Sequence, residues 1–444
     1  MIRSNALSAL ALVLLTVVAA PARAILTVEI TQGVDDPVRI AVVPFAGDAP
    51  ENVARVIQED LARSGLFAPL PVEDMLSLPS TRQAVFFQDW RVLGVDHLVI
   101  GRVRPTEDGR YEVAYELYDV VRGRQTGTDA RTVPADALRR AAHRAADWDF
   151  ELVTGLPGAF ATRILYVVAD DVGTPGARFR LEVADADGRN PRVLHRSTEP
   201  LMAATWAPDG RRIAYVSFET GNSAIFLQDL ATGRREQLTD YPGLNSAPGF
   251  SPDGRRLAFV LSRDGNPEVY VMDLDTRVLR RITHHYGIDT EPSFTPDGRH
   301  LLFTSSRGGE PQIYRYTFAN EQLRRLTFAG DYNTRARLLP DGRSLVYVHR
   351  ADGSDRDFRI AVQDLETGRM ATLTRTSMDE SPTIAPNGAM IMYATQEYGR
   401  GILSVVSVDG RVKVRLPASD GDVREPAWSP YLPEAVARST AAAQ

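Results

Sequence analysis

"SPDGRRLAFVLSRDGNPEVYVMDLDTRVLRRIT", residues 251–283, is one copy of a segment that the chain repeats. The copy before it reads "APDGRRIAYVSFETGNSAIFLQDLATGRREQLT", residues 207–239. The proline that opens each copy recurs at spacings of 44, 44, 44, 46 and 44 residues, at Pro208, Pro252, Pro296, Pro340, Pro386 and Pro430. A fixed period of about 40–50 residues indicates a repeat architecture.

Each copy has the pattern of antiparallel strands. Pro-Asp-Gly favours a tight turn, because proline fixes φ and glycine accepts a positive φ. Strands with a period of two residues follow at 257–260 and 269–272, and "VLRRIT" (278–283) closes the copy. No 3.6-residue periodicity is present, which excludes a helical solenoid. Four strands per repeat predict a β-propeller blade.

The two ends of the repeat region predict the number of blades. "RILYVV" (163–168) and "FRLEVADADG" (179–188) lack a Pro-Asp-Gly strand before them, and "REPAWSP" (424–430) has no further strands after it. Together these pieces make one blade, which joins five complete ones and closes the ring without an open edge. The fold prediction is therefore an all-β six-bladed β-propeller over residues 159–432.

Large apolar side chains stand two positions before each of these prolines. At strict repeat spacing they are expected to pack between blades rather than to form a ligand cage. They are Trp206, Phe250, Phe294, Leu338, Ile384 and Trp428.

The segment 37–158 mixes strands with helices and predicts an α/β N-terminal domain. The expected strands are "VRIAVVPF" (38–45), "HLVIGRVRP" (97–105) and "YEVAYELYDVV" (111–121), and the expected helices span 50–65, 86–94 and 134–155.

The chain begins with the pattern of an export signal. A cationic Arg3, an apolar stretch and an Ala-Arg-Ala site predict a signal peptide at 1–24, cleaved before Ile25, and the apolar run is short for a membrane span. The mature protein is expected to be soluble in the exported compartment. Residues 25–36, "ILTVEITQGVDD", alternate as a strand at a free end. Two interpretations stay open, an edge strand of the α/β domain and a strand that adds to a partner's sheet. A tail is expected at 433–444.

Composition excludes several classes of function. The net charge of −6 argues against nucleic-acid binding, and the absence of cysteine excludes thiolate chemistry. Neither G-x-S-x-G nor H-E-x-x-H occurs, and His284-His285 is expected to be loop surface. No enzyme, no catalytic residue and no cofactor are expected.

Acidic residues are expected in the loops before the inner strands, around one mouth of the propeller channel. They are Asp289, Glu291, Asp379, Glu380 and Glu425. A calcium-dependent hydrolase of the lactonase type, the alternative function, would need several carboxylates on one ion. Ala203, Ala247 and Arg335 at equivalent positions favour a protein ligand instead, and no metal ligands are assigned. A structural divalent cation in the channel stays open.

The order of signal peptide, free strand, α/β domain and blades resembles the TolB family of periplasmic Tol-Pal system proteins. The resemblance covers essentially the whole mature chain. It is carried by "VEITQGVDD" (28–36), "LYDV" (117–120), "GAFATRILYV" (158–167), "VYVMDL" (269–274), "TEPSFTPDG" (290–298) and, most specifically, "DGRVKVRLPASDGDVREPAWSPYL" (409–432).

The resemblance implies a protein-binding adaptor in the periplasm, which links the lipoprotein Pal to the inner-membrane protein TolA. It implies roles in outer-membrane integrity, cell division and protein import, with other outer-membrane proteins as further candidate partners, and a monomer that meets membranes only through its partners. It places TolA binding on Ile25, Leu26, Thr27, Val28, Glu29, Ile30, Thr31, Gly33, Val34 and Asp35. It places Pal binding on Leu244, Ser246, Ala247, Thr290, Glu291, Thr334, Arg335, Asp379, Glu380 and Glu425.

Two positions depart from the family's pattern. Leu244 stands where a polar residue or histidine is usual, and Arg335 stands where an acidic or small residue is commoner. The individual Pal contacts are therefore expected to differ from the family's. The resemblance also suggests a coupled switch, in which channel occupancy biases whether the free strand is packed or released.

Overall fold

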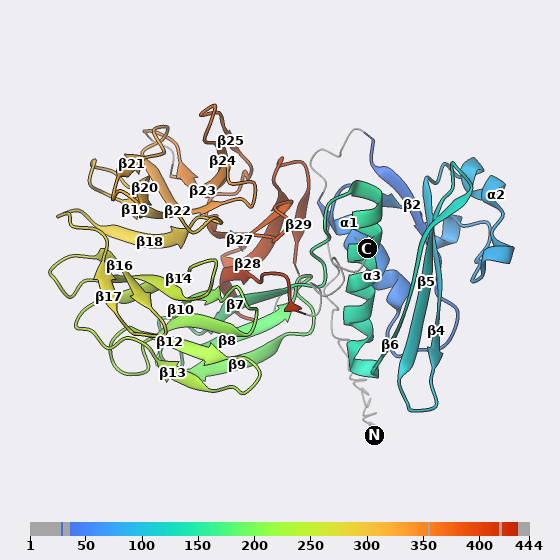
Figure 1. The fold of residues 1–444 in the computed structure, drawn as a ribbon, viewed down its shortest axis with the longest axis horizontal. Coiled ribbons are helices and arrows are strands. Elements are labelled where there is room, and N and C mark those ends of the chain that lie inside the picture. The colour runs from blue at the N-terminus through green and yellow to red at the C-terminus, as the bar shows by residue number, and fades with distance from the viewer. Residues whose placement is uncertain (1–27, 30–35, 354–355, 417–419, 434–444) are drawn as a thin grey trace, which may run out of the picture.

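A computed structural model describes residues 28–29, 36–353, 356–416 and 420–433 of the chain. A propeller and an α/β domain lie side by side, with helices α1 and α3 between the propeller and the sheet of the α/β domain (Figure 1). Among these residues no helix has both the length and the apolar character needed to cross a bilayer. The predicted signal peptide and the tail beyond residue 433 lie outside the described residues.

Six sheets form the propeller, as predicted, and four of them have four consecutive strands each. They are β10 (Leu201–Trp206), β11 (Arg212–Ser217), β12 (Ala224–Asp229) and β13 (Arg235–Gln237); β14 (Asn245–Phe250), β15 (Arg256–Leu261), β16 (Glu268–Asp273) and β17 (Leu279–Arg281); β18 (Asp289–Phe294), β19 (His300–Ser305), β20 (Gln312–Thr317) and β21 (Leu323–Arg325); and β22 (Tyr332–Leu338), β23 (Ser344–Arg350), β24 (Arg359–Asp364) and β25 (Met370–Thr372). The fifth sheet contains β26 (Glu380–Ile384), β27 (Met390–Glu397), β28 (Arg400–Ser407) and β29 (Lys413–Arg415).

The last strand of the chain closes the ring. The sixth sheet has the order β30-β7-β8-β9, from β30 (Asp422–Trp428), β7 (Arg163–Asp170), β8 (Arg178–Asp185) and β9 (Arg192–Ser197). Arg163 and Ser429 exchange two hydrogen bonds, and the Trp428 indole donates to Thr162 Oγ1 at 2.7 Å. We call this sheet the closing blade, and it confirms the prediction that the two incomplete pieces form one unit.

Repeated side chains explain why the copies agree. In the four blades with consecutive strands, a threonine just after the fourth strand accepts a hydrogen bond from a backbone N–H of the third strand, as Thr283 Oγ1 does from Val269 at 2.9 Å. Asp273 Oδ1 accepts from the N–H groups of the turn that follows it, which explains the Asp-Leu motif. The predicted interblade packing of the apolar residues before the turn prolines is confirmed, since all six join the core clusters of the blades.

The α/β domain has one mixed sheet with the order β3-β2-β4-β5-β6. Its elements are β2 (Val38–Val42), α1 (Val53–Arg63), β3 (Phe67–Pro69), η1 (Val72–Asp74), η2 (Arg82–Ala84), α2 (Phe87–Val92), β4 (His97–Pro105), β5 (Tyr111–Asp119), β6 (Arg124–Val133), η3 (Ala135–Ala137) and α3 (Leu138–Thr154). One face of the sheet packs under α1 and α3, and the other packs around Trp90 of α2. The predicted helices are confirmed, with Asn52 as the N-cap of α1 and Gly155 at φ 75° after α3.

The linker between the domains is fixed to both of them. The carboxylate of Asp147 on α3 accepts the backbone N–H groups of Phe160 and Ala161 at 2.6 and 3.1 Å. Asn387, in the turn after β26, donates to the carbonyl of Pro157 at 3.0 Å. The α/β domain therefore contacts the propeller on the side of the Pro-Asp-Gly turns.

The free N-terminal strand has a different neighbour from the one that the sequence suggested. β1 (Val28–Glu29) pairs with β29, with Val28 opposite Val414 and Glu29 opposite Lys413. The interpretation of these two residues as an edge strand of the α/β domain is therefore wrong, because they extend a propeller sheet. The other predicted residues of this strand, Ile25, Leu26, Thr27, Ile30, Thr31, Gly33, Val34 and Asp35, lie outside the described residues.

Candidate functional site: the propeller channel

Each inner strand of the propeller is interrupted by a bulge that faces the channel. In all six blades the register shifts within the strand, as between Thr290 and Ser293 in β18. Each bulge has a non-glycine residue with a φ between 50° and 55°, namely Ala203, Ala247, Glu291, Arg335, Ser381 and Glu425. A positive φ costs energy for an L-residue, and such residues gather at binding sites. These residues, which we call the bulge ring, stand five positions before the six repeat prolines.

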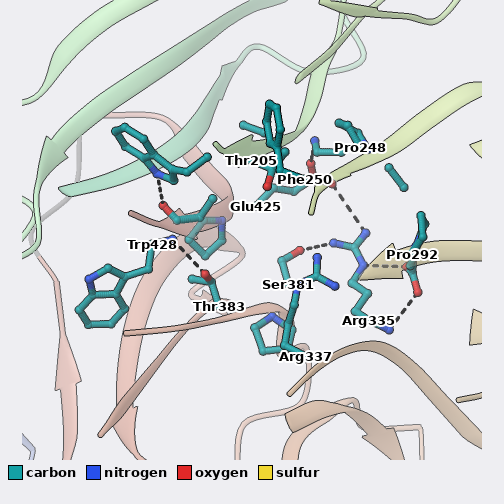
Figure 2. A pocket seen from close by; sticks show the side chains of 18 of the residues that line it. Thr205, Pro248, Phe250, Pro292, Arg335, Arg337, Ser381, Thr383, Glu425 and Trp428 are labelled. Carbon is teal, nitrogen blue, oxygen red and sulfur yellow. Dashed lines mark hydrogen bonds and ion pairs between the residues drawn. The ribbon is translucent and has the colours of Figure 1, made fainter. Parts of the chain in front are cut away.

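The bulge ring lines a channel with a volume of about 350 Å³. Trp206, Phe250 and Trp428 contribute apolar surface, and prolines that follow the bulges contribute more. In Figure 2 the Arg335 side chain extends across this space toward Ser381, with Glu425 and Phe250 on the far side. The channel is therefore a cavity with aromatic walls and a small number of polar side chains.

Arg335 is the electrostatic centre of the channel. Its Nε lies 3.0 Å from Glu291 Oε1, its Nη2 lies 3.7 Å from Glu425 Oε1, and its Nη1 donates to Ser381 Oγ. Burial opposes the charged guanidinium, but Glu291, Glu425 and Glu380 outweigh it and raise the pKa of Arg335. Four inner strands contribute these groups, so one side chain joins four blades across the channel.

The two glutamates of the bulge ring also accept backbone N–H groups of the next blade. Glu291 Oε2 accepts from Arg335 N at 2.9 Å, and Glu425 Oε2 accepts from Ala203 N. Both carboxylates are therefore engaged with donors of the chain itself.

Arg337, on the same strand as Arg335, has few partners. Among the described residues it makes one hydrogen bond, from Nη1 to the carbonyl of Ala336 at 3.0 Å, and no ion pair. Burial and the neighbouring Arg335 charge lower its pKa, against the opposing effect of Glu291. Arg337 lines the channel and has donors to offer a ligand there.

The same contacts bear on the cation that the sequence left open. Calcium requires several free oxygen ligands around one point. Glu291 and Glu425 point at the Arg335 guanidinium instead, so a cation would have to displace it. Among the described residues, the spacing of metal ligands occurs in one group, Asp60, His143 and Asp187, which lies outside the channel.

The structure brings six of the predicted Pal residues together in the channel wall. They are Ser246, Ala247, Thr290, Glu291, Arg335 and Glu425. The other four are not part of this wall. Leu244 is exposed at the entrance, Thr334 and Asp379 are buried, and Glu380 is exposed at the start of β26.

The predicted loop position of the acidic residues is wrong. Asp289 and Glu291 lie within β18, Glu380 begins β26 and Glu425 lies within β30, while Asp379 immediately precedes β26. Asp289 and Asp379 are fully buried, and Asp289 Oδ2 pairs inside its own blade with Arg307 at 2.6 Å. The residues two positions before the bulges, Asp289 and Asp379, are therefore buried in the blades and do not line the channel.

Ser381 and Arg337 were missed by the sequence analysis. The residue equivalent to Glu291 in the fifth sheet is Ser381, whereas the sequence predicted Asp379 and Glu380. Counting five residues back from Pro386 would have identified Ser381, because the bulge keeps this distance in every blade. Arg337 has no equivalent arginine in the other copies and carried no repeat signal.

Apolar side chains surround the end of the channel at which the inner strands begin. Leu244, Ile288 and Met378 each stand eight positions before a repeat proline and are exposed. Tyr286 and Phe328 are also exposed, and they lie in the loops that lead into the inner strands β18 and β22. We call these five residues the apolar rim. Since each inner strand runs from the rim to a Pro-Asp-Gly turn, the rim faces away from the α/β domain.

Comparison with known proteins identifies the family. Residues 26–126 match the TolB amino-terminal domain and residues 150–432 match the TolB beta propeller domain. A Tol-Pal system protein TolB from Alcanivorax borkumensis is 57% identical over 414 residues, which is 93% of this chain and 94% of that protein. The Pseudomonas aeruginosa protein of the same name is 51% identical over 95% of this chain and 98% of its own length. The crystal structure of TolB from Acinetobacter baumannii superposes with a TM-score of 0.84 at 45% identity and covers 91% of this chain and 100% of its own.

Proposed function

The chain belongs to the TolB family of Tol-Pal system proteins, and from this membership we propose that it is a periplasmic adaptor that links Pal to TolA. Members of this family are not enzymes, so the alternative of a calcium-dependent hydrolase is wrong. The proposed role is support of outer-membrane integrity and of constriction at division. Protein import and contacts with other outer-membrane proteins belong to the same proposal.

The observation that carries the proposal is the combination of an apolar rim with a polar channel. Exposed apolar side chains that surround a desolvated pocket are typical of protein-binding surfaces. The rim offers five such residues, and the channel behind it offers the donors of Arg337 and a small number of carboxylates. We propose that a segment of Pal covers the rim and places one side chain in the channel.

The N-terminal strand supports a separate binding element for TolA. Its pairing with β29 shows an extended segment that satisfies its hydrogen bonds on a sheet edge. A segment of this kind can exchange one edge for another. In the proposed mechanism, residues 25–36 leave β29 to bind TolA, and the protein acts as a monomer without a cofactor.

Calorimetry with purified domains tests this division. Deletion of residues 25–36 should abolish binding of TolA and leave the affinity for Pal unchanged. Thr290→Arg and Ala247→Trp should each lower the affinity for Pal by at least about tenfold, because each puts a large side chain into the channel. Ala231→Arg, on an exposed turn of β12 and β13, is the matched control. The proposal would be contradicted if the deletion variant bound neither TolA nor Pal. It would also be contradicted if the channel variants bound Pal with unchanged affinity.

A further inference from the structure

A buried cluster of charged side chains joins the two domains at a distance from the channel. Asp60 and Arg63 lie on α1, Arg139 and His143 lie on α3, and Asp185 and Asp187 lie at the end of β8 in the closing blade. We call these six residues the interface cluster. His143, Asp60 and Asp187 are each at least 97% buried.

His143 stands between carboxylates of both domains. Its Nδ1 lies 2.6 Å from Asp60 Oδ2, within the α/β domain. Its Nε2 lies 4.0 Å from Asp185 Oδ2 and 4.0 Å from Asp187 Oδ2, in the propeller. Nε2 is buried and has no hydrogen-bond partner within the described part of the chain. A neutral imidazole can donate from one nitrogen only, whereas the imidazolium donates from both.

The arrangement suits a proton better than a metal ion. Asp60, His143 and Asp187 have the spacing of metal ligands, but both carboxylates already pair with guanidinium groups. Arg63 Nη2 lies 2.8 Å from Asp60 Oδ1, and Arg139 Nη2 donates to Asp187 Oδ2. A divalent cation there would face two neighbouring positive charges. Protonation of His143 adds one positive charge to the cluster, whereas a divalent cation would add two.

Charge counting gives the same result. Three carboxylates in the interface cluster face two arginines, and Arg189 is shared between Asp187 at 4.0 Å and Glu59 at 3.6 Å, so a neutral His143 leaves an excess of negative charge in this region. Burying an unpaired charge is costly, and protonation of His143 removes it. The other charged groups that face this region are Glu51, Glu59, Asp147 and Arg189.

We infer that His143 is a proton-operated latch between the two domains, which holds the β8 end of the closing blade against α1 and α3 when the imidazole is protonated. Loss of the proton leaves Asp185 and Asp187 next to Asp60 without the charge between them. The contact between the domains then weakens, while each domain keeps its own core. The latch is independent of the partners proposed for the channel and for the N-terminal strand.

The direction of the pH dependence follows from the shifts. Burial disfavours the charged imidazole, but Asp60, Asp187 and Asp185 outweigh it and raise the pKa of His143 above the usual 6.5. Because the pKa of His143 is raised in the closed state, protonation of His143 stabilises the contact between the domains. This stabilisation is complete below pH 6.5 and is lost as the pH rises through the raised pKa. Burial raises the pKa of Asp147 to about 7, which adds a loss in the same direction. The pKa of Asp187 is lowered to about 2 because Arg63, His143 and Arg139 outweigh its burial, so acid opens the latch only near that value.

The absence of cysteine makes a distance measurement practical. Nitroxide labels on Glu107→Cys in the α/β domain and Ala231→Cys in the propeller, both exposed, report the relative position of the domains. In the full mature chain we expect one narrow distance distribution at about pH 5.5 and loss of that narrow component at about pH 9. His143→Gln should lose the narrow component at every pH, because glutamine donates to Asp60 without carrying the proton.

His195→Gln is the matched control. His195 pairs with Glu219 inside the propeller, and burial lowers the pKa of His195. This variant should therefore show the same pH-dependent loss of the narrow distance component as the wild type, which we call the wild-type step. A pH-independent distribution in the wild type, or a wild-type step in His143→Gln, would overturn the latch. A step that a chelator removes would overturn it in favour of a metal site.

A second readout does not depend on the folding of a variant. Nitrogen NMR of the histidine rings in the wild-type chain should show that the His143 imidazole titrates above 6.5. Its signal is assigned by its absence in His143→Gln, or by contact with α3 resonances where that variant does not fold. Titration of His143 at or below 6.5 would overturn the proposal.

Discussion

Arg335 Nε lies 3.0 Å from Glu291 Oε1, and this ion pair joins the inner strands of two neighbouring blades inside the channel. The same guanidinium reaches Glu425 and Ser381 on two further strands. The chain thus provides its own positive charge at the point where its channel carboxylates converge.

Replacement of Arg335 should therefore create a demand for a cation. In Arg335→Met the two glutamates face each other without compensation, and the free energy of unfolding should fall by about 1–3 kcal/mol. Calcium should then raise the melting temperature of Arg335→Met and leave that of the wild type almost unchanged, since binding to the folded state stabilises it. Differential scanning calorimetry with and without calcium measures both effects.

The double variant Arg335→Met with Glu291→Gln is the control for this prediction. It removes one of the two carboxylates, so the response to calcium should become smaller. A wild-type protein that responds to calcium as strongly as Arg335→Met would show that the guanidinium does not occupy the place of a cation.

The apolar rim yields a prediction about partner binding. Ile288→Asp and Met378→Asp should each lower the affinity for Pal by about tenfold or more. Burial of such an apolar side chain contributes about 1.5–3 kcal/mol to the free energy of binding. Val278→Asp replaces an equally exposed apolar residue in the turn between β16 and β17, at the opposite end of the blades, and should have no effect. Titration calorimetry compares the three variants. Equal affinities would show that Pal does not cover the rim.

The sequence predicted the blades well and the site less well. The positions of the turn prolines determine the number and closure of the blades, because every copy carries the same local turn chemistry. The bulges carry no such signal. Their residues range from alanine to arginine, since the backbone conformation at each bulge is imposed by strand pairing on both sides. Residue type alone therefore does not mark the bulges, although their fixed distance from the repeat prolines does.

The interface cluster shows a second limit of the sequence. Asp60, His143 and Asp187 are far apart in the chain, and each lies in a segment with an ordinary helical or turn pattern. Only the packing of α1 and α3 against the closing blade brings them together. Residue spacing within one element predicts contacts in that element, whereas contacts between domains depend on how the domains dock.

Two tryptophan N–H groups, one with a hydrogen-bond partner and one without, give a stability prediction. Trp428 Nε1 donates to Thr162 Oγ1 at 2.7 Å, whereas Trp90 Nε1 is buried without a partner among the described residues. Trp428→Phe should lower the free energy of unfolding by about 1–3 kcal/mol, since it removes a hydrogen bond and some contact area. Trp90→Phe should cost less, because its lost contact area is partly offset by removal of an unsatisfied donor. Urea unfolding followed by circular dichroism compares the pair, and a larger loss in Trp90→Phe would contradict the argument.

Two buried aspartates at the start of the inner strands should respond to different extents to replacement by asparagine. Asp379 and Asp289 stand seven positions before a repeat proline, where the neighbouring blades have Asn245 and Asn333. Thr376 donates to Asp379 Oδ1 at 2.6 Å. Burial outweighs the hydroxyl groups of Thr374, Thr376 and Thr395 and raises the pKa of Asp379 above its usual 3.8. Its ionised form is therefore unfavourable in the folded protein at pH 7.

Asp379→Asn should increase the free energy of unfolding by about 1 kcal/mol at neutral pH. Because the folded pKa is raised, the folded wild type holds the proton more tightly than the unfolded chain, and its stability falls as the pH rises from about 4 toward 7. The advantage of Asp379→Asn should accordingly disappear below about pH 3, where the carboxyl group is protonated in both states. Asp289→Asn is the matched control. Burial raises the pKa of Asp289 as well, but its carboxylate pairs with Arg307, so Asp289→Asn should gain less stability than Asp379→Asn. Urea unfolding at a series of pH values measures both variants. A destabilised Asp379→Asn at pH 7 would show that its carboxylate has a stabilising partner in the folded protein.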